Sequence, residues 1–270
     1  MKMLTCFIEP SQGTAKINGY DITTAPIKVT ELLGYLPESA PLYSEMTVSE
    51  FLAFIAEIRN KQGAEKSKAC ARVKEMCFLS DVWHQPIETL SKGYRQRVGF
   101  AQALIHDPEI LILDEPTDGL DPNQKHEMRQ LIATMGDAGK TIILSTHILE
   151  EVDAVCNRVV IIASGKLVAD ASPERLAEKS KLHNAVTLSF ESDIIQAAKS
   201  DLSCDADIEA IEVLNSSTYT LRVFPKQGQP ILKKVSDIVR EKNWNVQQIH
   251  VEQGRLDEVF RRVTIENESI

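Results

Sequence analysis

Two adjacent carboxylates follow an apolar run near the middle of the chain. Residues 111–113 read Leu-Ile-Leu, and Asp114 and Glu115 come directly after them. A short apolar run bounded by prolines indicates a buried strand, and open α/β sheets bind ligands at strand ends. Asp114 there is suited to hold Mg²⁺ through water, and Glu115 to polarise an attacking water. An ordinary solvated strand end is the competing interpretation, which these two residues alone do not exclude.

A second segment suited to chemistry lies upstream of this strand. Residues 90–97 read LSKGYRQR and place Ser91, Lys92, Gly93 and Tyr94 at the start of a predicted helix. The first turn of a helix exposes unpaired N–H groups at the positive end of the helix dipole, so it suits a phosphate. A plain serine N-cap is the alternative for this segment taken alone.

Two more segments lie downstream. Residues 119–122 read GLDP, a tight acidic turn that contains Asp121, and residues 145–147 read STH, which ends the next predicted strand with His147. An imidazole at that strand end would stand beside the predicted phosphate site. By itself, a histidine in such a place is equally consistent with a structural role.

The elements that position these residues alternate between strand and helix. Predicted strands cover 109–116, 141–147 and 158–163, with helices between them, which favours an α/β core with a mainly parallel sheet. A block near 45–105 is helical instead and interrupts that alternation. Its first helix opens with Thr47 and Glu50, the spacing of a capping box. We therefore predict an inserted helical subdomain at about 45–105.

The two ends of the chain have patterns of their own. Residues 1–8 resemble the last turns of a helix, and the next segment predicts a short strand that ends in an Asn18-Gly19 turn. Beyond residue 180 the order is strand, helix, strand, strand, helix, strand, that of a ferredoxin-like α+β unit. A last short helix contains the segment LDEVF. We predict a first domain over 1–178 and a C-terminal accessory domain over 183–265.

Composition limits the classes of function. The chain has 270 residues, of which 43% are hydrophobic and 26% charged, and a formal net charge of −9. A nucleic-acid-binding surface is not expected at that charge. Five cysteines without a Cys-x-x-Cys motif indicate reduced thiols rather than a disulfide framework or a zinc site. No apolar run approaches the length of a membrane span, so any membrane role is expected to run through a partner.

Taken together, LSKGYRQR, LILDEP, GLDP and STH in this order resemble the ATPase subunits of ABC transporters over about residues 1–175. The resemblance implies that Asp114 supports Mg²⁺, that Glu115 is the catalytic base and that His147 contacts the γ-phosphate of ATP. It implies that Asp121 orders the interface of a dimer of ATPase subunits. The signature residues Ser91 and Gly93 would then bind the ATP held by the opposite subunit.

One further motif of the family matches with a substitution. The segment GYLPE ends in Glu38, where the family has the glutamine of its Q-loop, which senses Mg²⁺ and touches the membrane subunit. A carboxylate can also ligate Mg²⁺, so we include Glu38 among the nucleotide and metal residues. In the signature, Lys92 and Tyr94 replace a glycine and a glutamine. Bacterial multidrug and gliding-motility exporters are similar at these places and at LDEVF, so the resemblance favours that subfamily.

The family's phosphate-binding loop has no match in the sequence. No Gly-x-x-x-x-Gly-Lys-Ser/Thr pattern occurs, and the nearest segment, 139–141, precedes a predicted strand instead of following one. We expect little ATP binding or hydrolysis by this chain alone, and we expect a truncated or misassigned start rather than a degenerate subunit. A catalytically impaired or regulatory subunit that lends Ser91 and Gly93 to a partner remains the alternative.

The resemblance also implies partners and a location. The expected function is an ATP-hydrolysing subunit, with ATP and Mg²⁺ as ligands, that drives export through a separate integral membrane permease. A second ATPase subunit, identical or not, would complete the ATP sites, and the chain would lie on the cytoplasmic face of the membrane. A DNA-repair ATPase would carry long coiled coils, and a soluble translation factor of this superfamily would carry two cassettes. Neither feature occurs here.

Overall fold

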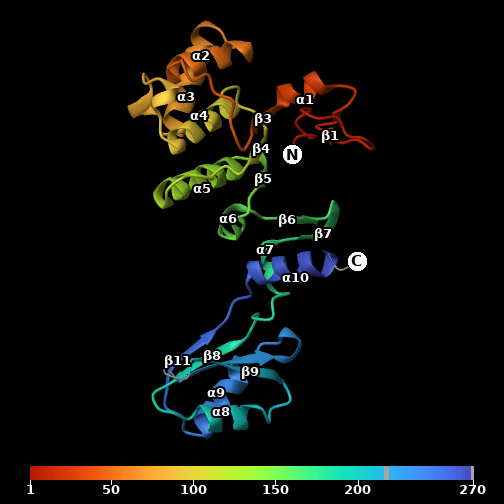
Figure 1. The fold of residues 1–270 in the computed structure, drawn as a ribbon, viewed down its shortest axis with the longest axis vertical. Coiled ribbons are helices and arrows are strands. Elements are labelled where there is room, and N and C mark those ends of the chain that lie inside the picture. Colours follow the sequence, from red (N-terminus) through yellow and green to blue (C-terminus); the bar gives the residue numbers. More distant parts are fainter. Residues whose placement is uncertain (216–218, 269–270) are drawn as a thin grey trace. The chain divides into compact units, whose positions relative to one another are not determined.

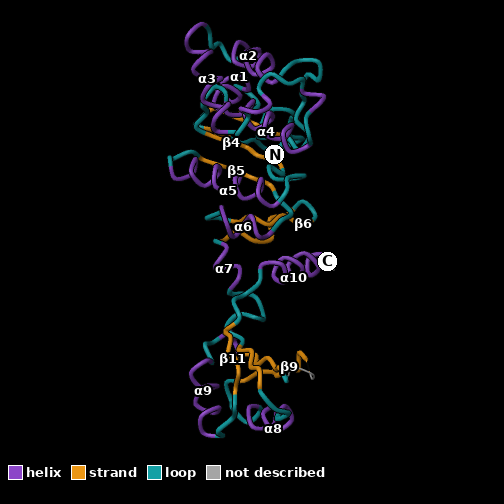
Figure 2. Tube along the Cα trace, turned by 90° about the vertical axis from the view of Figure 1, so that its left-hand side faces the viewer, coloured by secondary structure: helices purple, strands orange, loops and turns teal. Residues whose placement is uncertain are grey.

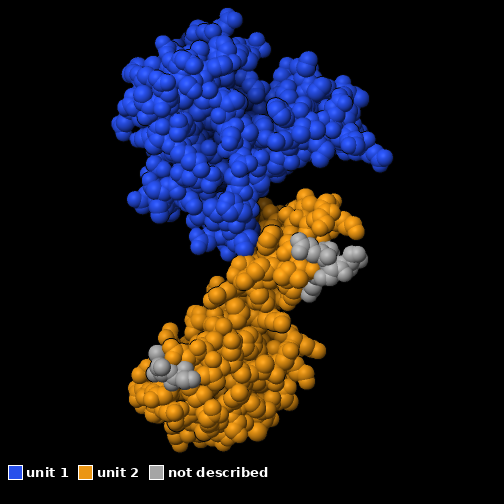
Figure 3. Space-filling view, in the orientation of Figure 1, with its two compact units in different colours: residues 1–155 blue, residues 156–270 orange. Residues whose placement is uncertain are grey.

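The chain forms two units. The structure, a computed structural model, describes residues 1–215 and 219–268. Its contacts divide the chain into Met1–Val155 and Cys156–Ile270, which are coloured separately in Figure 3. Among the described residues, no helix combines the length and the apolar composition that crossing a bilayer requires.

A three-stranded parallel sheet lies at the centre of the first unit. It consists of β3 (Leu33–Leu36), β4 (Ile110–Asp114) and β5 (Thr141–Ser145) in the order β3-β4-β5. The middle strand is the most apolar, and its residues 111–113 are fully buried. Parallel strands that end at one edge bring their following residues together there. This sheet confirms the predicted α/β core with its parallel strands.

Helices surround this sheet, and a group of them forms the predicted helical block. The first unit contains α1 (Pro26–Leu32), α2 (Val48–Ile58), α3 (Gly63–Met76), α4 (Lys92–Leu104), α5 (Pro122–Asp137) and α6 (Leu149–Val155). Two 3₁₀ turns, Ser80–Val82 and Ile87–Thr89, join α3 to α4. Helices α2, α3 and α4 pack on one another at the top of Figure 1 and share one apolar core with β4.

The predicted starts of two of these helices are confirmed. The Thr47 hydroxyl accepts from the Glu50 N–H, and the Glu50 carboxylate accepts from the Thr47 N–H, so α2 begins with a complete capping box. Helix α4 begins after Ser91, whose hydroxyl accepts from the Tyr94 N–H at 3.3 Å. Both starts follow from local side-chain to backbone hydrogen bonds, which a sequence displays directly.

The N-terminal segment matches one prediction and contradicts another. Strands β1 (Lys16–Ile17) and β2 (Tyr20–Asp21) form a hairpin whose turn is Asn18-Gly19, with φ of 47° and 84°. Both positive φ values fit the turn type that Asn-Gly favours. Residues 1–8, however, form successive turns rather than a helix, because Cys6 takes φ of 57° and interrupts the helical course.

The second unit begins with a hairpin rather than a strand of the parallel sheet. Strand β6 (Val159–Ala163) pairs antiparallel with β7 (Lys166–Ala171) through a turn at Ser164-Gly165. Our assignment of residues 158–163 to the parallel sheet is therefore wrong. A turn with positive φ at both of its central residues, 49° and 75°, returns the chain at once into an antiparallel neighbour.

The last helix packs on this hairpin. Helix α10 (Leu256–Glu268), which contains the LDEVF segment, contacts β6, β7 and α7 (Pro173–Ala177). The Glu258 carboxylate accepts from the Ser180 hydroxyl and from the Lys181 N–H, the latter at 3.0 Å. Leu256 and Val259 are buried. The segment therefore returns to the start of the second unit.

The ferredoxin-like order beyond residue 180 is confirmed. Four antiparallel strands lie in the order β11-β8-β10-β9, and two helices lie against the sheet (Figure 2). The alternate residues of β8 and β10 that face the helices are buried. The elements are β8 (Val186–Phe190), α8 (Ile195–Leu202), β9 (Ile208–Asn215), β10 (Thr220–Pro225), the 3₁₀ turn Lys226–Gly228, α9 (Leu232–Glu241) and β11 (Val246–Val251).

The division by contacts falls earlier than the domain boundary that the sequence predicts. The contacts divide the chain between Val155 and Cys156. The first predicted domain, in contrast, ends at 178, and the second begins at 183. The difference arises because the β6–β7 hairpin and α7 share contacts with α10, which joins them to the C-terminal unit. The functional domain assignment stays a prediction.

Candidate functional site

Asp114 lies at the end of β4, opposite Ser145 at the end of β5. The two residues are partners in the parallel register, and the Ser145 hydroxyl donates a hydrogen bond to Asp114 Oδ1. The Glu115 N–H donates to the Ser145 carbonyl at 3.1 Å, which carries the contact between the two strand ends one residue further. The structure thus holds both carboxylates at the carboxyl edge of the parallel sheet.

His147 joins this cluster from the loop after β5. Its Nδ1 lies 2.9 Å from Glu115 Oε2. The His147 side chain is 71% exposed and that of Glu115 20%. The hydrogen bond to Glu115 and the charge of Glu115 raise the pKa of His147, partly opposed by desolvation, and Asp118 and Glu151 raise it further. The charged imidazole is therefore favoured beside this carboxylate.

Glu115 is held in an uncommon backbone conformation. Its φ is 49°, in the left-handed region that non-glycine residues adopt seldom. The buried Gln96 side chain of α4 donates to the carbonyl of Glu115 at 3.2 Å and to that of Pro116 at 3.4 Å. The Asp118 N–H also donates to the Glu115 carbonyl, at 3.1 Å. Several contacts thus fix the turn that carries this carboxylate.

The signature segment and the acidic turn form a second cluster. Asp121 caps α5 through a capping box with Gln124, and a Cβ at the buried Gly93 would stand 2.5 Å from Gln124 Oε1. The start of α4 therefore lies close to the Gln124 side chain of α5, and a larger residue at position 93 would displace that side chain from its place in the capping box. Lys92 Nζ donates to Asp118 Oδ2 at 2.7 Å, and this bond lowers the pKa of Asp118.

The remaining predicted site residues are exposed or lie at the neighbouring strand end. Ser91 and Lys92 are exposed at the start of α4, and Tyr94 is half-buried one turn later. Glu38 is exposed two residues beyond β3, whose last residue, Leu36, is the register partner of Leu113. Glu38 thus follows the strand next to the one that carries Asp114. The structure brings Asp114, Glu115 and His147 together, and the signature residues form the separate cluster.

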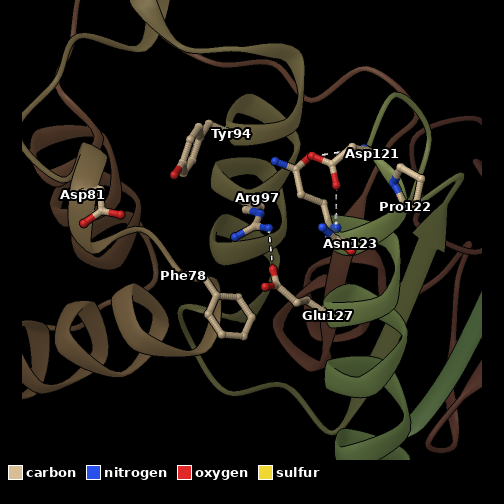
Figure 4. Close-up of a pocket in the computed structure, with 9 residues that line it drawn as sticks. Phe78, Asp81, Tyr94, Arg97, Asp121, Pro122, Asn123 and Glu127 are labelled. Carbon is tan, nitrogen blue, oxygen red and sulfur yellow. Dashed lines mark hydrogen bonds and ion pairs between the residues drawn. The ribbon is translucent and has the colours of Figure 1, made fainter.

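A hollow of about 630 Å³ lies beside α4, between that helix, the segment that follows α3 and the start of α5 (Figure 4). The buried Arg97 is bonded to Glu127 at 2.7 Å, and its guanidinium lies 5.4 Å from the Phe78 ring and 5.7 Å from the Tyr94 ring. None of Asp114, Glu115 and His147 lines this hollow. It is therefore distinct from the carboxylate cluster.

Comparisons with known proteins place the chain in a family. A family model described as ABC transporter matches residues 1–118. The ABC transporter ATP-binding protein NatA of Bacillus subtilis (strain 168) is 34% identical over 185 residues, which cover 67% of this chain and 74% of NatA. This chain belongs to the ABC transporter ATP-binding proteins.

This ABC protein is also similar to a second curated relative and to a solved structure. The daunorubicin/doxorubicin resistance ATP-binding protein DrrA of Streptomyces peucetius is 27% identical over 267 residues, 98% of this chain and 79% of DrrA. A solved structure of the ATP binding subunit of an ABC transporter gives a TM-score of 0.60 at 29% identity and covers 66% of this chain and 74% of that one. The chain spans 52 to 74% of the length of the first three curated relatives that it matches.

The residues at the sheet edge fit the ligand that ABC ATP-binding domains generally bind, ATP with Mg²⁺. Among the described residues, no group of three or more His, Cys, Asp or Glu side chains is placed to hold a metal ion. Mg²⁺ usually keeps several waters and binds through one or two carboxylates and the substrate's phosphates. A single carboxylate beside a hydroxyl, Asp114 with Ser145, suits that mode rather than a cage made of protein alone.

Three residues that support this site were not among those predicted from the sequence. Gln96 fixes the Glu115 turn, and Thr117 and Glu151 form a buried hydrogen bond behind it. A signal for Glu151 was present: it shares the 148, 151, 152, 155 spacing with three apolar residues, so it lies on the apolar face of α6. A carboxylate on such a face needs a hydrogen-bonding partner.

Proposed function

We propose that this chain is the ATP-hydrolysing subunit of an ABC transporter and that it drives export through a separate membrane permease. The observation that supports this most is the cluster of Asp114, Glu115 and His147 at the carboxyl edge of the parallel sheet, with His147 Nδ1 2.9 Å from Glu115 Oε2. The name of one relative, the daunorubicin/doxorubicin resistance ATP-binding protein DrrA, favours export.

Within this proposal each side chain at the edge has a role. Asp114 holds Mg²⁺ through water, with Glu38 as a second carboxylate from the neighbouring strand end. Mg²⁺ bound with ATP would neutralise charge on the phosphates. Glu115 takes the proton of the attacking water, since its carboxylate is only partly exposed and held by a fixed turn. His147, whose raised pKa favours the cation, contacts the anionic γ-phosphate.

The cluster formed by the signature segment and the acidic turn supports binding to a nucleotide that a partner subunit holds. Ser91 and Gly93 lie at the first turn of α4, where N–H groups and the helix dipole favour an anion. Lys92 adds a cation, and Tyr94 completes the segment. Asp121 stands at the adjacent turn as the cap of α5. We infer that these residues meet the ATP site of a second ATPase subunit, identical or different, as ABC subunits generally dimerise.

The finer assignments follow from departures in the motifs. Glu38, Lys92, Tyr94 and the LDEVF segment support the subfamily of multidrug and gliding-motility exporters. Contact with an integral membrane permease would hold the chain at the cytoplasmic face of the membrane. Nucleic acid is not among the proposed partners, given the net charge of −9.

A second candidate function is a regulatory or catalytically impaired subunit of the same assembly. The observation that favours it is the placement of Ser91 and Gly93 at the first turn of α4, apart from the carboxylate cluster, where N–H groups and the helix dipole suit a phosphate. Such a subunit would lend Ser91 and Gly93 to a partner that holds the nucleotide.

Binding and hydrolysis by the purified chain separate the two candidates. We would measure Mg·ATP binding by calorimetry and phosphate release at steady state, alone and with the permease that co-purifies from detergent-solubilised membranes. Hydrolysis that needs Glu115 supports the ATPase. ATP binding that appears only with a second subunit and needs Ser91, without hydrolysis at Glu115, supports the regulatory subunit. The absence of any multi-span protein from the purified complex would contradict both.

A further inference from the structure

A buried carboxyl group lies behind the Glu115–His147 pair. Glu151 belongs to α6 and is 2% exposed. Its Oε1 accepts a hydrogen bond from the Thr117 hydroxyl, and its Oε2 accepts one from the Thr146 hydroxyl at 2.8 Å. Each oxygen of this carboxyl group therefore binds a different loop.

Those two loops carry the two members of the pair. Thr117 follows Glu115 by two residues in the turn after β4, and Thr146 directly precedes His147 in the loop after β5. The Thr146 hydroxyl also accepts from the Ile148 N–H at 3.0 Å, which fixes the backbone on the other side of His147. Glu151 thus joins the two loops within two residues of Glu115 and directly beside His147.

The side chain of Glu151 makes contacts that the packing of α6 does not require. Both hydroxyls reach it from outside α6, and the Arg129 guanidinium of α5 approaches its Oε1 to 3.9 Å. A hydrophobic residue at this position on the apolar face would pack α6 without the cost of burying a carboxyl group. A carboxyl group that satisfies two separate loops, in contrast, fixes their relative position.

We propose that Glu151 is a positioning residue that ties the Glu115 turn to the His147 loop and thereby holds the two side chains in contact. Glu115 needs such support because its φ of 49° is sparsely populated unless its surroundings hold it. The catalytic consequence rests on the proposed ATPase function. The positional consequence does not, since it concerns a contact within this chain.

The test follows the imidazole of His147 by NMR as a function of pH, in the full chain without nucleotide. The signal is assigned with His147→Asn, and Glu115→Gln defines the titration midpoint of an unpaired His147. We expect Glu151→Gln and Thr117→Val to lower the midpoint of His147 most of the way to that reference. Thr117→Val is the decisive variant, because it removes a hydroxyl without removing any charge that faces the imidazole.

Two matched variants serve as controls. Glu150→Gln makes the same chemical change one residue away, at a side chain that is 86% exposed, and Thr117→Ser keeps the hydroxyl. Both should leave the midpoint close to that of the unaltered chain. Circular dichroism and the backbone amide spectrum check the fold. If Thr117→Val does not fold, Thr146→Val removes the other hydroxyl and is expected to act in the same way.

The outcomes separate this inference from the proposed function. Midpoints unchanged in Glu151→Gln and Thr117→Val, or lowered no more than in Glu150→Gln, would overturn it, as would a midpoint that Glu115→Gln leaves unchanged. Where the protein hydrolyses ATP, Glu151→Gln should lower kcat about tenfold or more with little change in KM. A chain that does not hydrolyse ATP would count against the proposed function and leave the titration result standing.

Discussion

His147 Nδ1 lies 2.9 Å from Glu115 Oε2, across the ends of two neighbouring parallel strands. The contact joins a carboxylate on a fixed turn to an imidazole that is largely exposed. Neighbouring parallel strands end at the same edge of the sheet. The pairing of β4 with β5 therefore suffices to bring together two residues that are 32 positions apart in the chain.

The first prediction concerns pH. The bond to Glu115 and its charge raise the pKa of His147 above the ordinary 6.5. A group with a raised pKa in the folded state contributes stability that is fully present below the unfolded pKa, and that contribution is lost as pH rises through the folded pKa. Glu115→Gln should therefore lower the His147 midpoint and remove this part of the pH dependence above about pH 6.5. NMR titration and urea unfolding at several pH values measure both.

The second prediction concerns hydrolysis. In a preparation that hydrolyses ATP, Glu115→Gln should lower kcat by about 10²–10⁴-fold, because an amide cannot take the proton of the attacking water. Nucleotide binding should change little. Glu109→Gln, at the exposed residue directly before β4, is the matched control and should retain the full rate. A Glu115→Gln variant with an unchanged rate would assign the base to another residue.

The third prediction concerns Gly34 on β3. A Cβ at this position would stand 2.3 Å from the Ala103 carbonyl oxygen and 2.6 Å from Leu111 Cδ2. Gly34→Ala should destabilise the first unit by about 3 kcal/mol, since a backbone atom cannot move aside as a flexible side chain can. Urea unfolding followed by Trp83 fluorescence, with Trp244→Phe in the background, measures it.

Gly136→Ala is the control for that substitution. Gly136 lies in α5, and a Cβ there meets nothing within 4 Å. Alanine at such a helical position should stabilise the unit by roughly 0.5–1 kcal/mol. Equal effects of the two alanines would show that the close approach at Gly34 does not govern the stability of the sheet.

The fourth prediction concerns the C-terminal sheet. Leu188 on β8 is fully buried between this sheet and its helices, and Phe190 beside it packs edge-on against Trp244 with ring centroids 5.9 Å apart. Leu188→Ala should destabilise this unit by about 2–5 kcal/mol through lost burial and a cavity. Unfolding is followed by Trp244 fluorescence in a Trp83→Phe background. Leu214→Ala on β9, where the leucine is 39% exposed, should cost no more than about 0.5 kcal/mol.

Where the sequence predicted structure well, a local interaction carried the signal. The Thr47–Glu50 capping box, the Ser91 cap and the Asn18-Gly19 turn each involve residues at most three positions apart. The ferredoxin-like order of the C-terminal unit followed from alternating strands and helices in a fixed sequence. Such features need no knowledge of distant partners.

Where the sequence misled, a distant partner decided. Residues 158–163 have the composition of a buried parallel strand, yet they pair antiparallel with β7. The LDEVF segment forms a terminal helix as predicted, but its packing against that hairpin is a contact that its own residues do not display. The composition of a segment does not say which strand it will pair with or which element it will pack against, because both depend on residues elsewhere in the chain.

The sequence by itself determined the family motifs, the helix starts and the strand that ends in Asp114 and Glu115, since each depends on neighbouring residues. Only the tertiary structure decided that His147 binds Glu115 and that Glu151 binds Thr117 in the Glu115 turn. The physical reason is that a hydrogen bond forms over about 3 Å, and only folding brings groups more than 30 residues apart to that distance.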